Sequence, residues 1–132
     1  MNLADAQKVI EAARMKADAL GIKVSIAVVD EGGHLVALNR MDGAPPLSPP
    51  VAEGKAMGAA LLRRDGGALL TLANDRPAFW SAVKEMTRGT MVPGLGSLPI
   101  QKDSTVVGAV GVSGGRPEQD AECAEAGAAS AG

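Results

Sequence analysis

The sequence predicts an α+β fold in which helices cover an antiparallel sheet built from two hairpins. Two pairs of short apolar runs are each joined by a turn, and such pairs fold as antiparallel hairpins. Segments with helical periodicity precede, separate and follow the two hairpins. A chain of 132 residues fits one ordinary domain. We therefore expect a single layered domain over residues 1–132.

The first element is expected to be an amphipathic helix over residues 3–20. Asn2 is a favourable N-cap residue, and apolar residues then recur at helical spacing. Charged residues such as Glu11 and Arg14 fall on the opposite face and should face water. Gly21 can end the helix in the left-handed conformation.

The first hairpin is expected over residues 24–40. Its first strand, residues 24–29, has Ser25 as its only polar residue and should be buried on both faces. A turn over residues 30–33 uses glycine for the positive φ of a tight hairpin. The return strand runs from His34 to Arg40. The second hairpin pairs residues 98–101 with residues 105–112.

Helices are expected between the hairpins and at the end of the chain. Ser48 should cap a helix that runs to about Arg64. Gly54 and Gly58 form a glycine stripe on this helix, a face without side chains that is suited to close packing. A short apolar stretch, residues 68–73, follows. A last helix starts at Pro117 and runs to about residue 129.

Another helix should be capped by Asn74 or Asp75. Its spacing places three residues on the inward face, namely Phe79, Val83 and Met86. Phe79 and Trp80 are adjacent, so at most one of them can be a core residue.

Charge and cysteine content exclude several classes of protein. The net charge is −2 with acids and bases intermixed, so the basic stripe of a nucleic-acid-binding protein is missing. No apolar run is long enough for a membrane span, and no signal peptide is visible, so we expect a cytoplasmic protein. Cys123, the single cysteine, fits a reducing compartment and an inert role.

His34 is the only histidine and the leading candidate for chemistry. It opens a strand directly after a Gly-Gly turn, so it should be accessible. A neutral imidazole can bind haem iron, and its ordinary pKa suits proton transfer. One histidine cannot form a zinc site without further ligands. The alternative is a structural histidine hydrogen-bonded to a nearby carbonyl.

Three other segments are weaker candidates. Ser113 and Gly114 end a strand before a helix, where free amides could hold a carboxylate or phosphate, although a tight strand-to-helix turn is the favoured interpretation. The loop over residues 89–96 could be a lid or a surface connection. Glu53 and Lys55 are expected to be solvated charges. No Ser/His/Asp set and no phosphate-binding glycine loop followed by lysine is found.

Three groups of residues form a recognisable pattern along the chain. The first is Ser25 to Ala37 with Asp30, Gly32, Gly33 and His34, followed by Arg40-Met41-Asp42-Gly43; the second is Lys55-Ala56; the third is Pro99-Ile100, then Val107 to Gly115 with Gln119-Asp120. This pattern resembles the GlcG/HbpS family of haem-degrading or haem-binding domains. The resemblance covers essentially the whole chain. It implies a layered fold with an antiparallel sheet, a homo-oligomer, and haem binding in some members.

The first hypothesis is therefore a homo-oligomeric module, a dimer or higher, that binds haem or another small ligand and is linked to haem or redox handling. His34 would be the ligand to iron if haem is bound. The expected pocket is lined by His34, Arg40, Lys55, Met91, Gly94, Ser113 and Gly114.

Two alternatives stay open. One is an enzyme acting on a small organic acid, with His34 as acid/base and with Arg40 or the amides at Ser113 holding the carboxylate. The other is an accessory subunit of a catabolic pathway. No nucleic-acid or membrane partner is expected.

Overall fold

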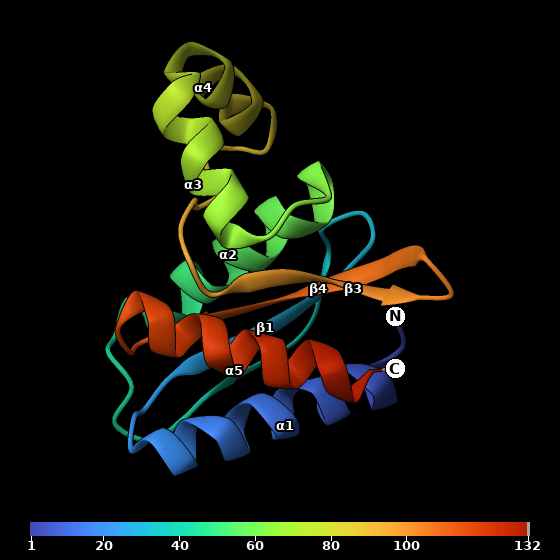
Figure 1. Ribbon diagram of the computed structural model, residues 1–132, viewed down its shortest axis with the longest axis vertical. Coiled ribbons are helices and arrows are strands. Elements are labelled where there is room, and N and C mark those ends of the chain that lie inside the picture. The colour runs from blue at the N-terminus through green and yellow to red at the C-terminus, as the bar shows by residue number, and fades with distance from the viewer. Residues whose placement is uncertain (132) are drawn as a thin grey trace.

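Two antiparallel hairpins lie side by side and form the central sheet of the computed structural model, which describes residues 1–131 (Figure 1). The inner strands of the two hairpins pair with each other, giving the order β2-β1-β4-β3. The predicted α+β fold is confirmed. The strands are β1 (Ser25–Asp30), β2 (Leu35–Arg40), β3 (Ser97–Lys102) and β4 (Thr105–Ser113).

Helices cover both faces of this sheet. Helices α1 (Leu3–Leu20) and α5 (Pro117–Ser130) pack against each other and against one face. Helix α2 (Ser48–Leu62) packs on the other face. Helices α3 (Gly66–Asp75) and α4 (Pro77–Met86) extend beyond α2, and α4 lies farthest from the sheet (Figure 1).

The sheet separates the core into two apolar clusters, one on each face. In β1, Ile26 and Val28 belong to the cluster under α1 and α5, whereas Ala27 and Val29 belong to the cluster under α2. The prediction that this strand is buried on both faces is confirmed. At Gly111 in β4, a Cβ atom would lie 2.1 Å from the carbonyl oxygen of Ala52, so only glycine lets α2 approach this closely.

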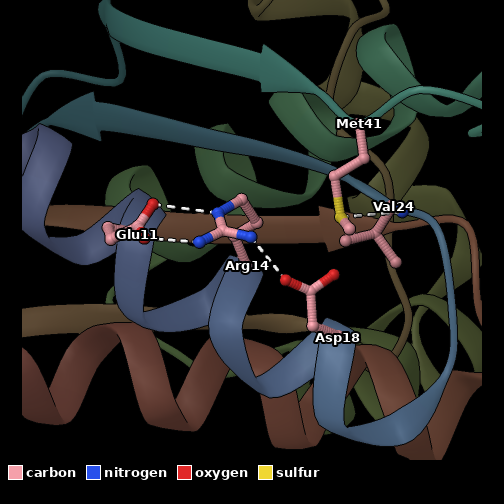
Figure 2. A network of polar contacts seen from close by, with 5 residues as sticks. All are labelled: Glu11, Arg14, Asp18, Val24 and Met41. Carbon is pink, nitrogen blue, oxygen red and sulfur yellow. Dashed lines mark hydrogen bonds and ion pairs between the residues drawn. The ribbon is translucent and has the colours of Figure 1, made fainter.

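Helix α1 has the predicted amphipathic character. On its exposed face Arg14 forms ion pairs with Glu11 and Asp18 (Figure 2). The same view shows the chain after the first hairpin returning to the start of β1, where the Val24 amide donates to the sulfur of Met41 at 3.5 Å.

The glycine stripe on α2 is used within the chain rather than between subunits. A Cβ atom at Gly54 would lie 2.3 Å from the carbonyl oxygen of Thr90, and one at Gly58 would lie 3.1 Å from Leu69. The stripe therefore lets residues 90–92 and α3 pack closely on α2.

Several local predictions around α2 and α3 are wrong. Ser48 is the first residue of α2 rather than its cap, because its hydroxyl is buried between the Pro45 carbonyl (2.6 Å) and the Ser25 hydroxyl (2.8 Å). Residues 68–73 are not a separate stretch, since Asp65 caps α3 through the amide of Ala68.

The predicted cap of α4 is also wrong, and its predicted inward face is right at one of three residues. Helix α3 continues through Asp75, and Arg76 joins it to α4 without a side-chain cap. Met86 is 83% exposed and Phe79 lies under the Arg76 guanidinium at the surface, whereas Trp80 is buried. Val83 does pack against the cluster under α2. A helix at the edge of the molecule buries only a narrow stripe, which here contains Trp80 and Val83 rather than Phe79 and Met86.

Candidate ligand-binding site

His34 lies in the turn between β1 and β2, and its side chain is 83% exposed. Its Nδ1 lies 3.2 Å from Oδ1 of Asp30, the last residue of β1. The same oxygen accepts hydrogen bonds from the amides of Gly32 (2.9 Å) and His34 (3.0 Å). Partial burial acts to raise the pKa of Asp30, but these bonds and the nearby imidazole outweigh it and lower the pKa.

This arrangement fixes how the imidazole is presented. A carboxylate accepts a hydrogen bond from Nδ1–H, so the neutral ring keeps its hydrogen on Nδ1 and leaves the Nε2 lone pair free. The sequence left open a structural histidine that is hydrogen-bonded to a nearby carbonyl. In the structure the His34 ring is hydrogen-bonded to the Asp30 carboxylate instead. His34 can therefore act as a metal ligand or as a base through Nε2.

An open cavity of about 570 Å³ lies beside His34, within the size range of small-ligand sites. Three parts of the chain form its walls: the β1–β2 turn, one face of α2, and the end of α4 with the residues that follow. Its lining residues are Gly32, Gly33, His34, Leu35, Glu53, Met57, Leu61, Met86, Thr87, Arg88 and Thr90.

A second polar cluster lies at the opposite end of the sheet. Lys55 is 8% exposed and Asp120 is 3% exposed, with Nζ and Oδ2 3.3 Å apart. Nζ also donates to the Val112 carbonyl (2.9 Å), and Oδ1 of Asp120 accepts the Gly115 amide (2.9 Å). Burial raises the pKa of Asp120, with Lys55 opposing that rise. The expectation that Lys55 is a solvated charge is wrong.

Ser113, Gly114 and Arg40 belong to this second end of the sheet. Ser25, the first residue of β1, pairs with Arg40 of β2 on one side and with Ser113 of β4 on the other. Gly114 lies next to the chain just before this strand's start, since a Cβ atom at Gly114 would lie 2.5 Å from the Lys23 carbonyl oxygen. Five residue steps along β1 separate this end from Asp30, about 17 Å at the usual strand rise. The chain therefore does not bring these residues to His34.

The two predicted residues of the 89–96 loop, Met91 and Gly94, do not line the cavity beside His34. Met91 is fully buried in the cluster under α2, and the Gly94 amide donates to the Gly66 carbonyl at the start of α3 (3.3 Å). The methionines that do line the cavity, Met57 and Met86, were missed from sequence. Glu53, Met57 and Leu61 recur every four residues along α2, a signal that could have identified this wall.

Other reactive groups are scarce in residues 1–131. Burial raises the pKa of the Cys123 thiol to about 11, as expected for an inert cysteine. Within that range no group of three or more His, Cys, Asp or Glu side chains is placed to hold a metal ion. None of the described helices is long and apolar enough to cross a membrane.

Comparison with known proteins agrees with these features. Residues 1–129 match the family described as "Haem degrading protein HbpS-like". Protein GlcG of Escherichia coli is 39% identical over 109 residues, which are 82% of this chain and 77% of GlcG.

Two solved structures share the fold. The crystal structure of HbpS superposes with a TM-score of 0.89 at 31% identity, covering 100% of this chain and 90% of HbpS. The crystal structure of a PduOC:heme complex gives a TM-score of 0.86 at 25% identity, covering 98% and 94% of the two chains. The matched motifs, the layered fold and these likenesses together show that the chain belongs to the HbpS-like family.

Proposed function

We propose that this protein binds haem or another small ligand in the cavity beside His34. The observation that carries the proposal is the exposed imidazole, whose Nδ1 is held by Asp30 at the edge of a cavity with both apolar and polar walls. The family description and the haem complex of the PduOC relative support haem as the ligand.

The residues around the cavity fit haem. Haem iron needs an axial donor, usually His, Cys, Met or Tyr. The sequence has no Tyr, and both Cys123 and Met91 are buried. His34 is therefore the strongest exposed donor, and Leu61, Met57 and Met86 offer apolar contacts for a porphyrin. Bound haem would supply redox-active iron, which links the site to haem or redox handling.

Adding haemin to the wild-type protein should produce a saturable, sharp Soret band. His34→Ala should abolish or shift that band, because it removes the axial nitrogen. Arg40→Ala is the matched control, since Arg40 lies at the far end of the sheet, and its spectrum should match the wild type. Absorbance titration measures all three proteins.

The outcomes separate the hypotheses. A band that His34→Ala leaves unchanged would exclude His34 as the ligand, and loss of the band in Arg40→Ala would place the site at the other end of the sheet. Without saturable haem binding by the wild type, the organic-acid enzyme or the accessory subunit becomes the better hypothesis. In the enzyme case His34→Ala would lose turnover.

We also propose that the protein self-associates. The support is the family resemblance together with exposed apolar side chains on the projecting α3–α4 arm, among them Leu70, Phe79 and Met86. Light scattering at micromolar concentration should give a mass of at least twice the 13.3 kDa chain. Phe79→Glu should reduce that mass, whereas Leu3→Glu, an exposed position on α1, should not. A strictly monomeric wild-type protein would contradict the proposal.

A further inference from the structure

Arg88 is a charged side chain on the α4 side of the His34 cavity. It is exposed and follows the end of α4 by two residues. Its guanidinium makes no hydrogen bond and no ion pair with any of residues 1–131. Arg88 is thus an unpaired cation that lines the proposed ligand site.

The backbone of Arg88 is in a conformation that glycine would adopt at lower cost. Its φ is 59°, in the left-handed region where helices commonly end on glycine. The turn is held by hydrogen bonds from the Arg88 amide to Glu85 (3.1 Å) and from the Gly89 amide to Lys84 (2.9 Å). An arginine at this position therefore needs an explanation beyond the turn itself.

Arg63 also has a left-handed backbone, but hydrogen bonds within the fold account for its side chain. It ends α2 with a φ of 54°, and its guanidinium donates to the carbonyls of Glu31 (3.0 Å) and Ala60 (2.6 Å). Those bonds tie α2 to the first hairpin and account for the side chain. Arg88 has the same strained backbone without any such bond.

We propose that Arg88 binds the acid group of an organic anion whose apolar body occupies the His34 cavity. The inference rests on the proposed function, because it takes this cavity as the ligand site. A guanidinium is suited to carboxylates, which it can bind through two parallel N–H donors. The cavity's other formally charged lining residue is Glu53 on α2, which repels an acid group and so favours its placement at Arg88.

The residues that line the cavity indicate the class of ligand. Met57, Leu61 and Met86 require an apolar body, and Arg88 requires at least one carboxylate. Haem with its two propionates has this chemistry, and so does a smaller apolar carboxylic acid.

The test compares acids with their esters. Haemin and haemin dimethyl ester form one pair of probes, and dansylglycine and its methyl ester form the other. Binding of each is titrated to the wild type, Arg88→Gly, Arg88→Lys and the control Arg64→Ala, which removes an exposed charge outside the cavity. Glycine fits the left-handed backbone, so Arg88→Gly should fold normally, as a thermal melt would verify.

We expect the wild type to bind at least one acid about ten-fold more tightly than its ester. Arg88→Gly should lose that ten-fold preference and bind the ester as before, Arg88→Lys should keep part of it, and Arg64→Ala should match the wild type. The pair that shows the preference identifies haem or a smaller acid. If a probe binds saturably and neither esterification nor Arg88→Gly weakens its binding, the role of Arg88 is excluded while the proposed cavity function stands. If the wild type binds no probe saturably, the proposed cavity function fails and this inference with it.

Discussion

Gly111→Ala should lower the free energy of unfolding by about 3 kcal/mol, because the new methyl group would meet the backbone of α2. A Cβ atom there would lie 2.1 Å from the Ala52 carbonyl oxygen and 2.6 Å from the Ala56 amide nitrogen. Backbone atoms cannot rotate aside as a side chain can, so the helix must move away from the sheet. Urea denaturation followed by circular dichroism measures the change.

Gly58→Ala is the matched control for this prediction. The same substitution within α2 meets the flexible end of the Leu69 side chain at 3.1 Å. It also gains about 1 kcal/mol of helix propensity, so its stability should stay close to that of the wild type. Equal stability of the two variants would mean that α2 does not lie against Gly111.

Lys55→Met should destabilise the fold by about 3–5 kcal/mol at neutral pH, because it leaves the buried Asp120 carboxylate without its cation. The effect should depend on pH. The pKa of Asp120 is raised by burial, so its contribution to stability is greatest at low pH and is lost as pH rises through that pKa. Without Lys55 the pKa rises further, and the loss of stability should begin above the carboxyl's ordinary 3.8 and grow toward neutral pH.

The double variant Lys55→Met/Asp120→Asn checks the cause of this loss. Asparagine cannot ionise, so the double variant should recover part of the stability and lose the pH dependence seen with Lys55→Met. Denaturant melts at pH 5 and pH 7 provide the comparison. Should Lys55→Met prove as stable as the wild type at both values, the buried pair contributes nothing to holding α5 on the sheet.

The elements that the sequence predicted well are those determined by near neighbours in the chain. Asn2 and Gly21 bound α1 as expected, and Gly21 has the predicted left-handed φ of 72°. The first hairpin was predicted from a β-branched run and a Gly-Gly turn, both of which act over a few residues. His34 was correctly expected to be accessible for the same reason.

The parts of the site that were not predicted depend on distant contacts. Lys55 and Asp120 are 65 residues apart, and only the packing of α2 and α5 around β4 brings them together. Arg40 and His34 bound the same strand and were assigned to one pocket, although an extended strand holds its two ends apart. Met86 and Arg88 reach the cavity only through the path of the α3–α4 arm, which no local pattern specifies.

The position of α4 has a consequence for how the cavity can open. Helix α4 packs mainly on α3 and lies farther from the sheet than the other helices. Its local unfolding exposes Trp80 and Val83 but leaves the core cluster under α1 and α5 in place, so it costs less free energy than global unfolding. Such an opening would carry Met86 and Arg88 away from His34 while both hairpins stay intact. A ligand held between these walls would stabilise the closed arm by the same free energy with which the arm stabilises the ligand.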